Sequence, residues 1–195
     1  MKKLSYFPLL FVAALFTNCD TDDDTFYKTI YVEGNNNIVT FPATTTYNVG
    51  DYFYVTADID RYIPEPGETT LLDIYWTTGN APTFVFSYVI ERKINATDWE
   101  VVTVNDNQLD INAGDAQNGA YVFGICEYDG VDEYLYNVGF PLSTAGNYRV
   151  AFGYNSSSTN SVELVSQNAT KNLIVNLNAA VANLDSAGFF YFNVN

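Results

Sequence analysis

The chain has 195 residues, of which 23 are Asp or Glu, 8 are Lys or Arg and none is His, so its formal charge at pH 7 is −15. The length allows one compact domain or at most two small ones, and with 48% hydrophobic and 16% aromatic residues the chain can build a substantial core. The scarcity of cations argues against nucleic-acid binding, because phosphate neutralisation needs clustered Lys and Arg. The absence of histidine excludes Ser-His-Asp and Cys-His catalysis and every histidine-ligated metal site.

Residues 1–18 have the pattern of a secretory signal peptide. Two lysines precede an apolar stretch at residues 4–16, which is too short for a membrane-spanning helix of roughly 20 apolar residues. This stretch leads into Leu15-Phe16-Thr17-Asn18-Cys19, which resembles the lipobox of bacterial lipoproteins. The resemblance implies that Cys19 becomes lipidated and N-terminal. A plain signal peptide followed by an incidental cysteine is the alternative.

Residues 19–25 form an acidic tether, with Asp at positions 20, 22, 23 and 24. A run of like charges is typical of a solvated, self-repelling spacer. The run also resembles the export signal of Bacteroidota lipoproteins, which implies a location on the outer face of the outer membrane. In enteric bacteria an Asp after the lipidated Cys resembles an inner-membrane retention signal instead. The abundance of Asn, Tyr and Asp favours the surface location.

The remaining chain, residues 26–195, reads as a single all-β domain. Apolar and polar residues alternate with a period of two in short segments that are rich in β-branched and aromatic residues and bounded by turn signals. Helical spacing occurs only at 176–184, so one short helix is predicted there. The fold class predicted is an antiparallel two-sheet sandwich. The predicted strands lie at residues 52–59, 72–76, 84–90, 99–104, 121–125, 134–140, 150–154 and 189–194.

Two segments resemble immunoglobulin-like domains. Tyr47-Asn48-Val49-Gly50-Asp51 precedes a predicted strand, as in bacterial surface modules of this class, and Leu142-Ser143-Thr144-Ala145-Gly146-Asn147-Tyr148 resembles the approach to a tyrosine corner. The resemblance implies that Trp76 is the buried tryptophan of strand C. Val150 stands where antibody domains have their second cysteine, so no inter-sheet disulfide is expected.

Cys126 is the only cysteine besides Cys19. With no histidine to generate a thiolate, we expect it to be a buried, inert thiol rather than a nucleophile.

The acidic residues form two clusters in the sequence, one at Asp106, Asp110 and Asp115 and the other at Asp129, Asp132 and Glu133. Oxygen-rich loops suit Ca²⁺, but the first cluster lacks the Gly and distal Glu of an EF-hand loop. Solvated loop acids are the favoured interpretation, so no metal and no cofactor is assigned. Glycosidases use a pair of carboxylates, but a chain with so many acidic residues contains such pairs by chance, so they do not indicate this activity.

Tyr52 and Tyr54 are the most suggestive candidates for ligand binding. Alternation places them on the strand face opposite Phe53 and Val55, so they point away from the main core unless another layer covers them. Two exposed rings on one strand form a platform for sugar rings.

The sequence therefore predicts a lipid-anchored protein of the cell envelope with a non-catalytic binding role, such as glycan capture at the outer surface. Its expected partners are the membrane, through the lipid on Cys19, and a glycan or an envelope protein. The alternative is a structural or adhesion component of the cell surface that binds no small ligand.

Overall fold

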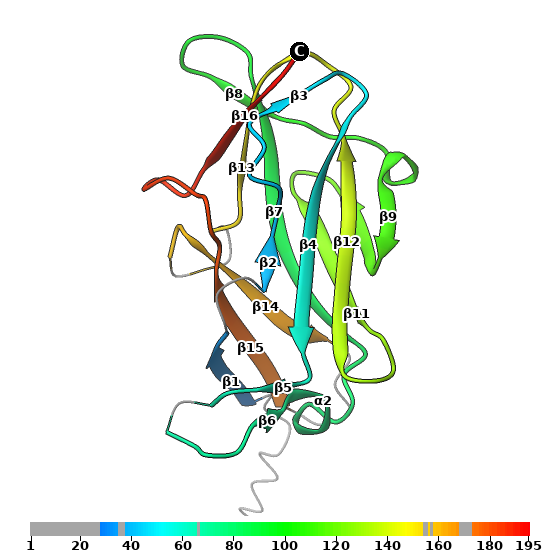
Figure 1. Cartoon of the computed structure of the whole chain (residues 1–195), viewed down its shortest axis with the longest axis vertical. Coiled ribbons are helices and arrows are strands. Elements are labelled where there is room, and N and C mark those ends of the chain that lie inside the picture. The colour runs from blue at the N-terminus through cyan, green and yellow to red at the C-terminus, as the bar shows by residue number, and fades with distance from the viewer. Residues whose placement is uncertain (1–27, 35–37, 66, 154–155, 157, 168–172) are drawn as a thin grey trace, which may run out of the picture.

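A computed structural model describes residues 28–34, 38–65, 67–153, 156, 158–167 and 173–195 of the chain. The predicted signal peptide, Cys19 and the acidic tether lie outside these residues. Within them the prediction of an all-β protein is confirmed (Figure 1).

Most strands belong to one large curled sheet. Its main path runs through eight hydrogen-bonded strands in the order β1 (Lys28–Glu33), β15 (Leu173–Ala180), β14 (Ser161–Gln167), β7 (Thr83–Lys93), β11 (Val122–Tyr128), β12 (Glu133–Pro141), β4 (Tyr52–Asp60) and β2 (Val39–Thr40). Six further strands join this path, namely β3 (Thr46–Tyr47), β8 (Trp99–Val101), β9 (Asp110–Ala113), β10 (Asp115–Asn118), β13 (Gly146–Ala151) and β16 (Phe190–Val194). Two small elements, β5 (Tyr62–Ile63) and β6 (Leu72–Asp73), form a separate hairpin. A 3₁₀ turn, η1 (Asp106–Gln108), precedes β9.

Strand β7 is the centre of this sheet. Its first half pairs with β14 and β11, while its second half pairs with β13 and β8. Residues 84–91 of β7 are all buried, which explains the nearly continuous apolar run there. Because β7 exchanges partners on both edges, strands from both sides of the core are joined in one sheet.

Gly114 marks the point where the chain passes from one side of the core to the other. It separates β9, which pairs with β12, from β10, which pairs with β11. Its φ is +68°, and a Cβ atom there would lie 2.3 Å from the carbonyl oxygen of Ile125 and 2.8 Å from that of Leu135. A side chain therefore clashes with both neighbouring backbones, so only glycine fits this crossing.

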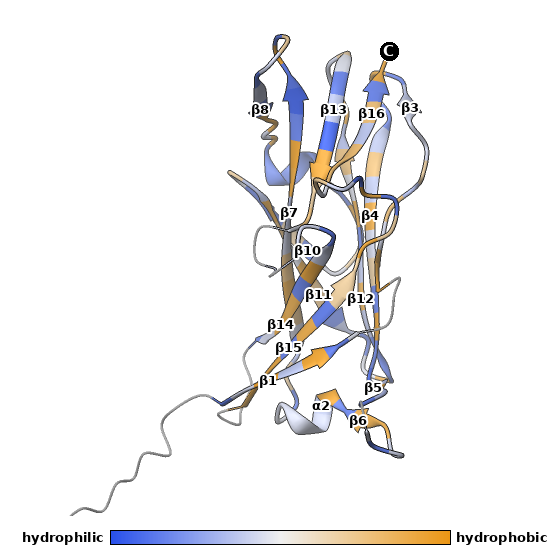
Figure 2. Cartoon of the chain, turned by 90° about the vertical axis from the view of Figure 1, so that its left-hand side faces the viewer, coloured by the Kyte–Doolittle hydropathy of each residue, from blue (hydrophilic) through white to orange (hydrophobic). Residues whose placement is uncertain are grey.

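The core is built from aromatic rings that meet across the curled sheet. Phe53 of β4 stacks on Phe192 of β16 at 4.8 Å between ring centroids, and Phe86 of β7 meets Tyr136 of β12 edge-on at 5.0 Å. Figure 2 accordingly places β7 and β4 on opposite sides of the molecule. The Tyr136 hydroxyl is buried but shares a 3.0 Å hydrogen bond with that of Tyr88, which satisfies both groups.

The segment that resembles the approach to a tyrosine corner contains one hydrogen bond from a side chain back to the upstream backbone. Tyr148 is buried, and its hydroxyl donates a 2.6 Å hydrogen bond to the carbonyl oxygen of Thr144, four residues upstream. The bond fixes the entry of the chain into β13.

The helix predicted at 176–184 is wrong. Residues 173–180 form strand β15, which pairs with β14 on one edge and β1 on the other. Val175, Leu177 and Ala179 are buried and lie two positions apart, so apolar residues at a spacing of two coexist with the helical spacing of Leu177 and Val181. Pairing on both edges overrides the local helical signal.

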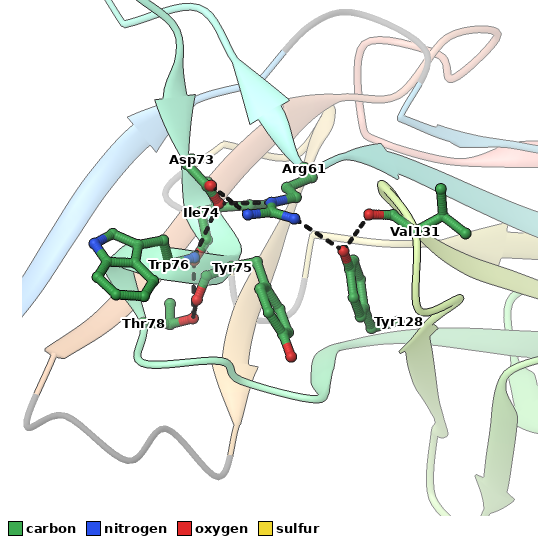
Figure 3. A network of polar contacts seen from close by, with 8 residues as sticks. All are labelled: Arg61, Asp73, Ile74, Tyr75, Trp76, Thr78, Tyr128 and Val131. Carbon is green, nitrogen blue, oxygen red and sulfur yellow. Dashed lines mark hydrogen bonds and ion pairs between the residues drawn. The ribbon is translucent and has the colours of Figure 1, made fainter.

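The assignment of Trp76 to a buried strand is also wrong, because its side chain is 66% exposed. It lies in a short helix, α2 (Ile74–Thr77), that begins where Asp73 accepts a hydrogen bond from the Trp76 backbone N–H (Figure 3). The Asp73 carboxylate also receives two hydrogen bonds from the Arg61 guanidinium, at 2.9 and 2.6 Å. This cap ends the predicted strand after two residues.

We expect Trp76→Ala to change the free energy of unfolding by less than about 0.5 kcal/mol, because an exposed ring contributes little to packing.

Asp73→Ala removes both the cap and the Arg61 partner and should cost about 1–2 kcal/mol at neutral pH. The Arg61 hydrogen bonds lower the pKa of Asp73, so this contribution is present at neutral pH and is lost as the pH falls through that lowered pKa. Denaturant unfolding of both variants measures the difference, and a large loss for Trp76→Ala would restore the buried-tryptophan assignment.

Candidate functional site

The two tyrosines predicted as a ligand platform lie on the outer face of β4. The alternating Phe53 and Val55 are completely buried, whereas Tyr52 is 37% exposed and Tyr54 is half-buried. The two ring centroids are 6.1 Å apart and the ring planes are inclined by 40°. The structure therefore brings the two rings together as a tilted pair at the surface.

Gly139 of β12 makes room for this pair. It lies opposite Tyr54 in the β4–β12 ladder, and a Cβ atom there would be 2.7 Å from Cε1 of Tyr54 and 3.2 Å from Cβ of Tyr52. The Tyr54 ring consequently rests directly on the backbone of β12. A larger residue at position 139 would displace it.

Asp110 holds the Tyr54 ring in place. The Tyr54 hydroxyl donates a hydrogen bond to Oδ2 of Asp110, and this bond is the main reason that the pKa of Tyr54 is raised above its ordinary value. The amide of Asn112 lies 3.5 Å from the same carboxylate oxygen. One face of the Tyr54 ring is therefore held against Gly139 and its hydroxyl is held by Asp110, so the ring has one fixed orientation.

A shallow hollow of about 400 Å³ lies farther along the same sheet, over β2, β4, β9 and β12. The hydroxyls of Thr40 and Thr56 share a 2.7 Å hydrogen bond in it, and Oδ1 of Asn137 is buried with no hydrogen-bond partner. An unpaired acceptor of this kind favours a ligand or water that donates a hydrogen bond. The hollow is lined by Thr40, Thr56, Ala57, Asp58, Ala113, Leu135, Tyr136 and Asn137.

Three of the acidic loop residues form local hydrogen bonds. Asp106 accepts a bond from the Asn118 backbone N–H, Asp115 from that of Ala116, and Asp129 from those of residues 131–133. The backbone donors lower the pKa of Asp129. Over the described ranges, the acids and cysteines form no group of three or more able to hold a metal ion.

Cys126 lies in β11 and is completely buried, as expected. Burial raises the pKa of its thiol well above the ordinary value, which suits a packing role rather than nucleophilic attack.

Sequence reasoning placed the two tyrosines on an outer face but did not predict the residues that contact them. Asp110 is 56 positions from Tyr54 and was grouped with loop acids, and neither Gly139 nor Asn137 belongs to a recognisable motif. Alternation signals which face of one strand is outward, but it does not reveal which strand lies beside it.

No family model, curated protein or solved structure matches the chain. Among the residues described, none of the helices has the length and apolar character needed to cross a membrane.

Asp58 in the hollow provides a test of the local electrostatics. Asp58 is exposed, but partial desolvation of its carboxylate and the neighbouring Asp60 raise its pKa, and the pKa of Glu133 on the adjacent strand is raised mainly by Asp58. The negative charges of Asp58 and Glu133 disfavour one another, as like charges do across a sheet.

We expect Asp58→Asn to raise the melting temperature at pH 7, with a gain of less than about 1 kcal/mol because the site is exposed. Raised acid pKa values mean that the wild-type folded state gains stability as the pH falls toward the ordinary carboxylate pKa. The advantage of Asp58→Asn should therefore shrink over that pH range. Thermal melts from pH 7 to pH 4, with Glu68→Gln as an exposed control, measure it; a constant gain would contradict the explanation.

Proposed function

We propose that this chain is a non-catalytic glycan-binding protein of the cell envelope, and that Tyr52 and Tyr54 form its binding platform. The observation that carries the proposal is the pair of outward rings 6.1 Å apart, one of them fixed by Asp110, beside a hollow lined with hydroxyls and an unpaired amide oxygen. Tyrosine rings offer an apolar face to the C–H groups of a pyranose, and convergent polar groups orient its hydroxyls.

Binding is favoured over hydrolysis because of where the carboxylates lie. A glycosidase keeps one carboxylic acid protonated in an enclosed site near neutral pH. Asp58 is exposed on an open sheet, and Asp110 is engaged by Tyr54. Neither residue is in the enclosed environment that such chemistry uses.

The location proposed is the outer face of the outer membrane, with residues 1–18 removed and Cys19 lipidated. The support is the lipobox-like sequence and the acidic run that follows it. A cysteine carrying several acyl chains is held firmly, at about 0.8 kcal/mol per buried methylene. A structural or adhesion role at the same surface is the second candidate, favoured by the chain's strongly acidic composition.

The architecture proposed with this function is an immunoglobulin-like sandwich in which β4 and β12 face β7, β13 and β16. It is supported by the Tyr148–Thr144 hydrogen bond and by the Phe53–Phe192 stack across the core. Trp76 departs from the pattern, so the resemblance rests on these contacts and not on a strand-C tryptophan.

The platform is tested by screening the protein on an array of neutral glycans and then measuring affinities of variants for a glycan that binds. Tyr52→Ala should weaken binding about tenfold through loss of one stacking contact and leave the melting temperature unchanged. Tyr54→Phe keeps the ring but loses the Asp110 bond and should weaken binding by a smaller factor. Tyr31→Ala, at a tyrosine that is 75% exposed on β1, is the matched control.

Two results would count against the platform. A large fall in melting temperature for Tyr52→Ala would show that the ring belongs to the core. Absence of glycan binding by a stable protein would favour the structural or adhesion role.

Lipidation is tested by metabolic labelling with a tagged fatty acid in a bacterium that matures lipoproteins. The wild type should be labelled and Cys19→Ala should not, since the thioether forms on that sulfur. Cys126→Ala is the control for the other cysteine and should keep the label. Labelling that survives Cys19→Ala would disprove the anchor.

A further inference from the structure

A second group of exposed aromatic and polar side chains lies at the end of the molecule where the chain terminates. Strands β3, β16, β13, β7 and β8 are neighbours there, and β8, β16 and β3 lie together near the C-terminus in Figure 1. A groove of about 390 Å³ crosses these strands. It is lined by Thr45, Lys93, Trp99, Asn147, Tyr148, Tyr191, Phe192 and Asn193.

The strand registers explain why these residues meet. Asn147 of β13 is opposite Asn193 of β16, and Lys93 of β7 is opposite Trp99 of β8. Along β13 and β16, these positions alternate with the buried Tyr148 and Phe192. Two amides, an ammonium group and an indole are therefore brought onto one outer face by four different strands.

Trp99 and Tyr191 are the aromatic walls of the groove. Their ring centroids are 5.8 Å apart, and Tyr191 is 45% exposed. The Arg149 guanidinium lies 4.4 Å from the Trp99 ring centroid and 4.0 Å from that of Phe189, and it forms a 2.6 Å ion pair with Glu91. Arg149 therefore supports the Trp99 ring while its own charge is balanced, and it does not act as a free cation.

Lys93 is the cation left available in the groove. Its Nζ atom lies 5.7 Å from the Trp99 ring centroid. In the part of the chain that the structure describes, each of the three arginines has a carboxylate partner within 2.6 Å, whereas Lys93 has none. An unpaired ammonium beside two aromatic rings and two amides is a local site for an anion on an otherwise acidic protein.

We propose that this groove binds a saccharide that carries a single carboxylate, that is, a terminal uronic acid. Trp99 and Tyr191 pack against the C–H faces of the sugar ring, the amides of Asn147 and Asn193 exchange hydrogen bonds with its hydroxyls, and Lys93 pairs with the carboxylate. With 23 acidic against 8 basic residues in the chain, a densely charged polyanion is repelled as a whole. One carboxylate on the sugar matches Lys93, the one lysine that lines this groove.

The groove lies on strands other than β4, so this inference does not depend on the tyrosine platform. A negative result at one site does not count against the other, because different variants test the two sites.

The test is calorimetric titration of the full-length chain with a tetrasaccharide ending in one glucuronic acid, and with its carboxyl-reduced form. The wild type should bind the acidic form saturably and more tightly than the reduced form. Lys93→Gln should weaken binding of the acidic form about tenfold and leave the reduced form unchanged, since it removes only a charge-assisted contact. Lys28→Gln, at a lysine on β1, is the matched control and should have no effect.

Tyr191→Ala should weaken binding of both sugars, because it removes a wall that both forms contact. Exposed Lys93 can be replaced without disturbing the core, and thermal melts of each variant confirm that the fold is kept. The proposal is overturned if no saturable binding is found, if the reduced sugar binds as tightly as the acid, or if Lys93→Gln binds like the wild type.

Discussion

The fold depends on the burial of one strand, β7, on both of its faces. Its apolar run from Phe84 to Ile90 requires cover above and below, and its backbone groups require partners along both edges. These needs are met by four different strands, with β14 and β11 along the first half and β13 and β8 along the second. The sheet curls as a result, because the strands that pair with the two halves of β7 enclose one shared core.

Both candidate sites follow from this closure through a single aromatic contact. Phe53 of β4 stacks on Phe192 of β16 in the core. The neighbours of Phe53 in the chain are Tyr52 and Tyr54, and those of Phe192 are Tyr191 and Asn193. Since strand residues alternate in direction, packing the two Phe rings inward forces these neighbours outward on opposite sides of the core. The two sites are thus back to back, and their positions are set by core packing.

The parts of this arrangement that lie within one strand were predictable. Alternation located β4, β7 and β12 and placed Tyr52 and Tyr54 on an outer face, because the period of two is a property of a single strand. It failed at Trp76, where one side chain, Asp73, caps a helix, and in β15, where pairing on both edges decides the structure. The contact of Asp110 with Tyr54 and the assembly of the groove around Trp99 depend on which strands become neighbours. The closure of the whole sheet decides these neighbours, so a single strand's pattern does not reveal them.

The distribution of charge gives the two sites different preferences. Two of the three arginines that the structure describes form both an ion pair and a contact with an aromatic ring: Arg61 contacts Asp73 and the Tyr75 ring, and Arg149 contacts Glu91 and the Trp99 ring. They hold surface rings in place without adding net positive charge. The hydrogen-bond partner of Tyr54 is Asp110, a carboxylate, and the hollow on the same sheet contains Asp58, so this face disfavours an anionic ligand. The groove with Lys93 presents a positive charge instead, so the ligands proposed for the two sites differ in charge, being neutral at the tyrosine pair and singly acidic at the groove.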